Sequence, residues 1–247
     1  MDTFRFYQNL DRRNPGSVVF TSSYLTPLPL DRRSVIADLG CGYGSRAAWV
    51  ARSRCCEMHV FDTSTQSLDC TFARAEEGGS ESQMVLHHVP DATYEQLGAQ
   101  PQSYDLVIAE GIGFDVDPFR KLQAWRPLVK PGGAIAIVVP GLTSAQANSD
   151  VATPLNERRG APLRTLADYH EQIASLEGIK LIHQVSLAQY SWDEHYQNLG
   201  RAIRALLKNG DASEGDSGII TARAELDWYR SQARGYVFLQ AFVLGVE

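Results

Sequence analysis

Short apolar runs and amphipathic stretches alternate along the chain from residue 35 to about residue 140. Apolar runs of about four to eight residues bounded by turn residues are typical of buried strands, and longer stretches with helical spacing are typical of covering helices. The pattern predicts strands at residues 35–39, 59–61, 84–89, 104–109 and 134–139. This alternation predicts a doubly wound α/β fold, in which helices cover both faces of a mostly parallel sheet.

Helices are expected between these strands at residues 45–52 and 64–77, the second capped by Thr63 or Ser64. A further helix is expected to end near Val129, because Lys130 is followed by proline and two glycines that favour a reversal. The later pattern predicts helices at 165–176, 192–208 and 221–233, strands at 180–187 and 236–244, and a surface loop at 209–218.

Composition narrows the class of protein. With 247 residues and 44% hydrophobic content, the chain has the size of one α/β domain. Its net charge of -6 and the lack of a basic run predict no nucleic-acid partner. We expect no membrane segment and a cytoplasmic location, because neither an apolar stretch of about 18 residues nor a leader-like start occurs. Four cysteines without zinc-type spacing are expected to be reduced thiols.

The strongest functional pattern is an apolar strand that ends in Asp38 and continues into Gly40, Gly42 and Gly44. Glycine permits the backbone angles of a strand-to-helix turn and lets a ligand lie against the main chain. Position 45 is serine, so the spacing departs from the G-x-G-x-x-G pattern of dinucleotide-binding proteins. The next strand ends in Asp62, where a carboxylate can accept both hydroxyls of a ribose.

These residues resemble the class I S-adenosylmethionine-dependent methyltransferases, whose glycine motif is similar to D-x-G-x-G-x-G and whose second strand ends in an acid. The resemblance implies a Rossmann-like, mostly parallel seven-stranded sheet, with the last strand antiparallel at its edge. It also implies one domain over 1–247, with an N-terminal lid at 1–30, a cofactor-binding core at 31–140 and a substrate-side half at 141–247. The N-terminal and late helices would form the lid over the substrate.

The resemblance assigns S-adenosylmethionine as the cofactor and implies a set of contacts with it. The glycine turn would hold the amino acid portion, the second strand end the ribose, and the residues after the third strand the adenine. The alternative for Asp62 is a solvated acid at the end of a strand. The alternative for Asp91 is an aspartate that stabilises a turn or caps a helix. The implied cofactor residues are Asp38, Gly40, Cys41, Gly42, Gly44, Asp62, Thr63, Asp91 and Ala92.

Glu110 and Gly111 close the fourth strand and resemble a branch of small-molecule methyltransferases that carries Glu-Gly at this point. That branch also has an N-terminal element similar to L-P-R-x-G-P-G-S-x-x-x-T, from which this chain departs at Asp11 and Asn14. The resemblance implies that Glu110 faces the reacting end and the cofactor. It adds Arg12, Ser17 and Thr21 to the cofactor site, with Arg12 against the methionine carboxylate. The alternatives are that Arg12 is a solvated surface residue, or that Arg13 contacts the methionine carboxylate instead.

A late aromatic segment, Trp192–Leu199, is similar to W-x-x-Y-Y-x-P-L of the same branch, with His195 in place of the first tyrosine. A histidine beside an acceptor pocket can act as a general base, although a packing role is the alternative. With Glu110 and His195, Tyr169 completes the candidate catalytic set, and Tyr7, Trp192 and Tyr196 are expected to wall the pocket. His87 and His88 point to opposite faces of one strand, so no metal site is assigned.

We therefore expect in-line methyl transfer to a small molecule through an oxygen or nitrogen atom, with positioning as the main contribution of the protein. Nucleobase methylation is disfavoured, because the Asn- or Asp-Pro-Pro-aromatic signature is replaced by Glu110–Phe114. The alternative is a cyclase or lyase that consumes the same cofactor, for instance by forming azetidine-2-carboxylate and methylthioadenosine. A third hypothesis is a non-catalytic cofactor-binding protein. The identity of the acceptor and the oligomeric state stay open.

Overall fold

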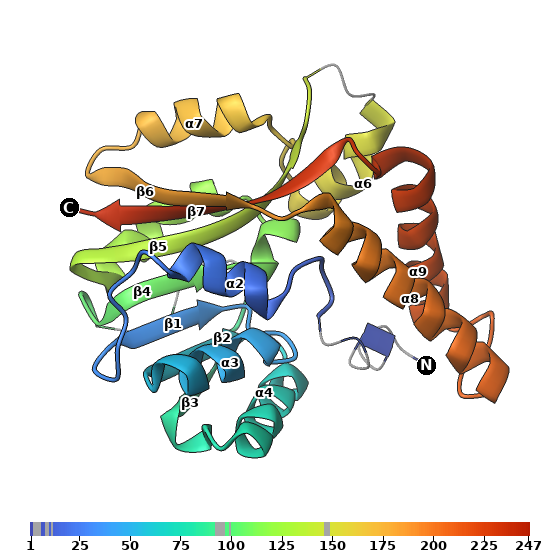
Figure 1. The fold of residues 1–247 in the computed structure, drawn as a ribbon, viewed down its shortest axis with the longest axis horizontal. Coiled ribbons are helices and arrows are strands. Elements are labelled where there is room, and N and C mark those ends of the chain that lie inside the picture. Colours follow the sequence, from blue (N-terminus) through green and yellow to red (C-terminus); the bar gives the residue numbers. More distant parts are fainter. Residues whose placement is uncertain (2–5, 8–9, 11, 92–96, 99, 146–148) are drawn as a thin grey trace.

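A seven-stranded sheet with strand order β3-β2-β1-β4-β5-β7-β6 forms the centre of the molecule (Figure 1). The computed structural model describes residues 1, 6–7, 10, 12–91, 97–98, 100–145 and 149–247. Five neighbouring strands are parallel: β1 (Val35–Leu39), β2 (Glu57–Asp62), β3 (Met84–His88), β4 (Tyr104–Ala109) and β5 (Val129–Leu142). The predicted doubly wound α/β sheet is thus confirmed.

The last two strands, β6 (Ile179–Ser186) and β7 (Val237–Val246), complete the sheet. β7 is antiparallel to both β5 and β6, so it lies inside the sheet and β6 forms the edge. The prediction of an antiparallel last strand is confirmed, whereas its placement at the edge was wrong. The reason is that β7, the last strand in the chain, lies between β5 and β6 in the sheet.

The helices lie on both faces of the sheet (Figure 1). Ser64 caps α4, because its hydroxyl accepts a 3.2 Å hydrogen bond from the amide of Ser67. Thr165 and Asp168 form a capping box at the start of α7. The α-helices are α2 (Val18–Leu25), α3 (Ser45–Arg54), α4 (Thr65–Gly78), α5 (Leu122–Trp125), α6 (Ser149–Arg159), α7 (Leu166–Ala174), α8 (Gln189–Asn209) and α9 (Ser217–Trp228). Short turns of other helical type are η1 (Glu81–Gln83), η2 (Gly111–Phe114), η3 (Pro118–Arg120), η4 (Arg126–Leu128) and η5 (Tyr229–Ala233).

The sheet separates two apolar cores, and alternate residues of β5 show the division. Ala134, Ala136 and Val138 face the core that contains α2, α3, α8 and α9. Ile135, Ile137 and Val139 face the core that contains α5 and α7. Successive side chains of a strand point to opposite faces, and each face is covered here, so β5 is apolar and buried throughout residues 134–139.

Three local expectations differ from the structure. The N-terminal helix α2 buries Phe20, Tyr24 and Leu25 in a core and is therefore a layer of the fold rather than part of a lid. Helix α6 was not predicted. The predicted reversal at Lys130–Gly133 lies within the range of β5, where the ladder with β4 shifts between Val129 and Ala134. No helix in the described part of the chain has the length and apolar character needed to cross a bilayer.

Candidate active site

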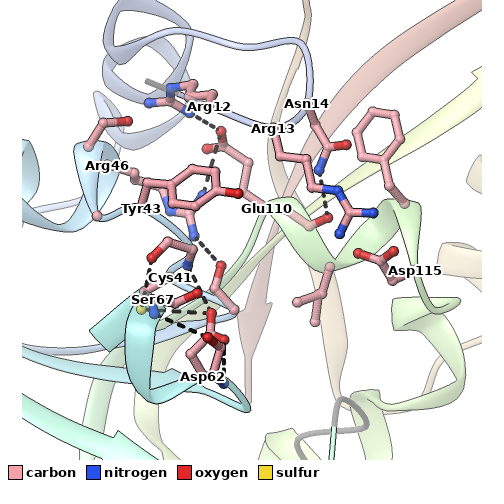
Figure 2. Close-up of a pocket in the computed structure, with 18 of the residues that line it drawn as sticks. Arg12, Arg13, Asn14, Cys41, Tyr43, Arg46, Asp62, Ser67, Glu110 and Asp115 are labelled. Atoms are coloured by element: carbon pink, nitrogen blue, oxygen red, sulfur yellow. Dashed lines mark hydrogen bonds and ion pairs between the residues drawn. The ribbon is translucent and has the colours of Figure 1, made fainter. Parts of the chain in front are cut away.

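A pocket of about 620 Å³ lies at the carboxyl ends of β1, β2 and β4 (Figure 2). Open α/β sheets bind ligands at this end, where the strand order reverses, and here the reversal falls between β1 and β4. The segment of residues 12–16, which we call the strap, crosses the pocket before α2 begins. The pocket is lined by strap residues 12–15, residues 40–46, residues 62–64, Ser67, residues 110–112, Phe114, Asp115 and Leu239.

The glycine turn after β1 has the backbone geometry that the sequence predicted. Gly40, Gly42 and Gly44 have φ of 68°, 56° and 80°, in the left-handed region that favours glycine. A Cβ on Gly44 would lie 2.4 Å from Cα of Thr71, so α4 packs directly against the turn. A Cβ on Gly42 would meet no atom within 4 Å, so its free side is open for a ligand.

Asp62 lies at the pocket end of β2, with 8% of its surface exposed. One carboxylate oxygen accepts a 2.9 Å hydrogen bond from the amide of Gly42, and the other accepts a 3.0 Å bond from the amide of Ser64. These two amides hold the carboxylate plane and leave further lone pairs free for hydroxyl donors. Cys41 lies beside it, and burial raises the pKa of its thiol, so it is not an activated nucleophile.

Glu110 is buried at the end of β4 and receives donors from three elements. Its carboxylate accepts hydrogen bonds from Tyr24 at 2.6 Å, Thr21 at 3.1 Å and Arg12 at 2.5 Å, and Arg46 Nη1 lies 3.7 Å away. Burial opposes ionisation, but the two arginines and the two hydroxyls outweigh it and lower the pKa of Glu110. Glu110 is therefore an ionised anchor rather than a proton acceptor.

Asp38 does not line the pocket and instead holds Arg46, which does. The guanidinium Nε of Arg46 lies 3.1 and 3.2 Å from the two carboxylate oxygens of Asp38, and Nη2 donates to the same carboxylate. Both side chains are buried. Asp38 was expected to contact the cofactor directly. The structure instead shows that it positions Arg46, which lines the pocket. The prediction missed Arg46 and Tyr24, because only the fold shows what a charged or phenolic helix residue faces.

The structure brings some of the predicted residues into the pocket and places others outside it. Thr21 lies behind Glu110 and does not line the pocket. Ser17 caps α2 by accepting a 3.1 Å hydrogen bond from the amide of Phe20. Asp91 is exposed and absent from the lining residues, and Ala92 lies outside the described residues. The predicted residues that line the pocket are Arg12, Gly40, Cys41, Gly42, Gly44, Asp62, Thr63 and Glu110.

Tyr169 is buried in the core that contains α7, where its ring stacks on Phe119 at 5.3 Å. Its hydroxyl donates a 2.8 Å hydrogen bond to the carbonyl of Pro140. It does not line the pocket, so its expected catalytic place is not supported by its position. Its surroundings are those of a core residue.

His195 also lies outside the pocket lining, on α8, with its ring edge-on to Tyr196 at 5.1 Å. Burial lowers the pKa of His195 to about 4, so the imidazole is neutral and weakly basic at pH 7. Tyr7 and Tyr196 do not wall the pocket either, since both hydroxyls donate to Glu225, at 2.6 and 3.3 Å. These positions favour a packing role over catalysis.

The end of the pocket beyond Glu110 is formed by the strap and by η2. Asn14 donates a 3.4 Å hydrogen bond to the carbonyl of Gly111, and Asp115 accepts a 2.6 Å bond from Arg158 of α6. The Arg158 guanidinium also lies over the ring of Phe114, at 5.8 Å. A Cβ on Gly113 would lie 2.0 Å from the carbonyl oxygen of Val138, so η2 packs directly against β5.

Comparison with known proteins agrees with this geometry. Residues 36–133 match the family model described as a methyltransferase domain. The matched segment, which is less than half of the chain, is similar to a methyltransferase domain. The ribosomal protein L11 methyltransferase of Shewanella woodyi is 32% identical over 124 residues, which are 50% of this chain and 39% of that protein. The chain thus matches well under half the length of this curated relative.

Two solved structures have the same fold as this chain. YjhP from E. coli has a TM-score of 0.82 at 21% identity, over 99% of each chain. A methyltransferase from Geobacter sulfurreducens in complex with S-adenosyl-L-homocysteine has a TM-score of 0.80 at 20% identity, over 100% of this chain and 99% of the other. The pocket of the present structure fits a ligand of this kind, because Asp62 offers free acceptor sites beside the open face of Gly42.

Proposed function

We propose that the protein transfers the methyl group of S-adenosylmethionine to an oxygen or nitrogen atom of a small molecule. The observation that carries this proposal is the placement of Asp62 and Glu110 in one pocket, with the glycine turn beside them. A volume of about 620 Å³ falls in the range of small-molecule sites. The net charge of -6 provides no attraction for a polyanionic acceptor.

Three groups of residues would hold the cofactor. Asp62 would accept the ribose hydroxyls, and the backbone of Gly40–Gly44 would hold the amino acid portion. The Arg12–Glu110 ion pair presents one charge of each sign to the ammonium and carboxylate of that portion. When bound, the cofactor supplies an electrophilic methyl group on a sulfonium centre.

The protein would contribute position rather than proton transfer. Glu110 is already ionised and surrounded by donors, and neither His195 nor Tyr169 lines the pocket. The acceptor would lie against Asn14, Phe114 and Asp115, beyond Glu110. Holding a nucleophile in line with an activated methyl group supplies much of the barrier reduction in such a transfer.

Cyclisation or cleavage of the cofactor is not favoured, because the matched family model and the proteins from Shewanella woodyi and Geobacter sulfurreducens are described as methyltransferases. A direct test is incubation with S-adenosylmethionine, with and without a metabolite extract, followed by mass spectrometry of the nucleoside products. We expect S-adenosylhomocysteine only when extract is present. Methylthioadenosine without extract would contradict methyl transfer.

The nature of the acceptor is tested with a methyl-labelled cofactor. We expect label in the low-molecular-weight fraction of the extract, and label confined to protein or nucleic acid would contradict a small-molecule acceptor. Asp62→Ala is expected to abolish labelling by loss of cofactor binding. Tyr169→Phe, which changes no residue of the pocket lining, is the matched control and is expected to retain it.

A further inference from the structure

Two histidines on neighbouring strands meet on one face of the sheet, away from the cofactor pocket. In the register of β2 and β3, His87 pairs with Phe61, two residues beyond His59. Residues two apart on a strand share a face, so His59 and His87 lie diagonally on the same side. Nε2 of His87 lies 3.0 Å from Nδ1 of His59. Neither residue lines the cofactor pocket.

A carboxylate fixes the orientation and the tautomer of the His59 ring. Oε1 of Glu57 lies 2.7 Å from Nε2 of His59, and because a carboxylate only accepts, Nε2–H donates this hydrogen bond. Nδ1 of His59 is then the lone-pair nitrogen, and it faces His87. The hydroxyl of Tyr104 lies 3.5 Å from the same Nδ1. A carboxylate that fixes the tautomer of one imidazole is the arrangement found behind metal-binding histidines.

We propose that His59 and His87 form a binding site for a divalent transition-metal ion. Nδ1 of His59 and Nε2 of His87 would be the protein ligands, Glu57 would orient His59, and water would fill the remaining positions. Imidazole nitrogens favour zinc, copper and nickel over magnesium or calcium. Two bonds of about 2.0–2.1 Å at a tetrahedral angle separate the nitrogens by roughly 3.3 Å. The present distance of 3.0 Å between the two nitrogens is about 0.3 Å shorter than that value.

The proposed site does not use the adjacent pair His87 and His88, which the sequence analysis excluded as joint ligands. His87 and His88 are adjacent on β3 and point to opposite faces, and His88 instead lies 3.0 Å from the carbonyl of Thr63. Only the register of β2 and β3 shows that the partner of His87 is His59. A metal bound there would join the edge strand β3 to its neighbour and stabilise the folded state, because ligands that bind only that state raise its melting temperature.

The test is titration of the full-length protein with Ni²⁺ and with Zn²⁺, followed by calorimetry and thermal unfolding. We expect about one equivalent to bind, with a rise in Tm that grows with metal concentration. His87→Gln keeps a donor for Nδ1 of His59 but removes the imidazole ligand, and it is expected to weaken binding at least tenfold. His59→Gln should do the same, whereas His88→Gln is the matched control and should bind as the native protein does.

Exposed Cys55 also attracts soft metals, so the difference between native protein and His87→Gln is the deciding quantity. Equal binding by the two proteins, or no binding by the native protein, would overturn the proposal and leave the histidines as a hydrogen-bonded pair. Affinity for S-adenosylhomocysteine serves as the check on folding, since we expect it to be unchanged in every histidine variant. The metal titration does not depend on whether the protein transfers methyl groups, so the two proposals can fail separately.

Discussion

The phenol of Tyr24 donates a 2.6 Å hydrogen bond to Glu110 and so connects helix α2 to the end of β4. Both groups are buried, and Thr21 of the same helix donates to the same carboxylate oxygen. The pocket therefore has one wall anchored by helix α2, which precedes all the strands of the sheet in the chain. The stability of the fold and the shape of the pocket are coupled through this carboxylate.

Replacing Glu110 with Gln should lower both stability and affinity for S-adenosylhomocysteine. The substitution removes the negative charge that Arg12 and Arg46 face, and breaking a buried ion pair costs about 3 kcal/mol. Urea unfolding and calorimetry measure the two effects. Tyr24→Phe removes one hydrogen bond and keeps the charge, so we expect a loss of about 1 kcal/mol with little change in affinity. Native affinity in Glu110→Gln would contradict this view of the site.

Two glycines of the turn should respond differently to alanine. Gly44→Ala places a Cβ 2.4 Å from Cα of Thr71 at a φ of 80°, and we expect a loss of roughly 3 kcal/mol. Gly42→Ala meets no atom within 4 Å, so we expect only about 1 kcal/mol of backbone strain but a large loss of cofactor affinity. Thermal unfolding and calorimetry separate the two. Full affinity in Gly42→Ala would show that the cofactor lies elsewhere.

His195 should make stability depend on pH. Its folded pKa of about 4 lies below the ordinary value of 6.5 because of burial, so the folded state disfavours the protonated form. The full contribution is present above pH 6.5, and up to about 3 kcal/mol is lost as the pH falls towards 4. His195→Leu should flatten this part of the curve in urea unfolding at several pH values. A slope equal to that of the native protein would contradict the burial effect.

Tyr169→Phe should leave cofactor binding and turnover unchanged. The hydroxyl donates to the carbonyl of Pro140 in the core, so its removal is expected to cost about 1 kcal/mol of stability. Denaturant unfolding and the product assay measure the two quantities. A tenfold fall in turnover at native stability would restore Tyr169 to the catalytic set.

The parts of the fold that sequence reasoning recovered are those with strong local patterns. Residues 104–109 form β4 as predicted, because a continuous apolar run between turn residues has few alternatives. The glycine turn and Asp62 were also predicted, since backbone angles and a strand-end acid are local requirements. Helix α6 was missed because Pro154 interrupts it and its apolar residues are few.

The unpredicted features depend on contacts between distant residues. Nothing near Arg46 in the chain indicates that Asp38 and Glu110 would face it, and the sheet order alone brings Glu110 close. Tyr169 was assigned to the catalytic set but lies in the core, because the sequence of a helix does not show whether an aromatic residue faces a core or a pocket. The insertion of β7 between β5 and β6 is likewise a property of the whole topology.

The close approach of Gly113 to the carbonyl of Val138 limits how the end of the pocket formed by η2 can be redesigned. No larger residue fits at Gly113 without moving a central strand, so the floor formed by η2 cannot be raised or tilted by substitution there. Efforts to widen or narrow the range of accepted compounds should instead begin with Asn14 and Phe114, whose side chains line the cavity.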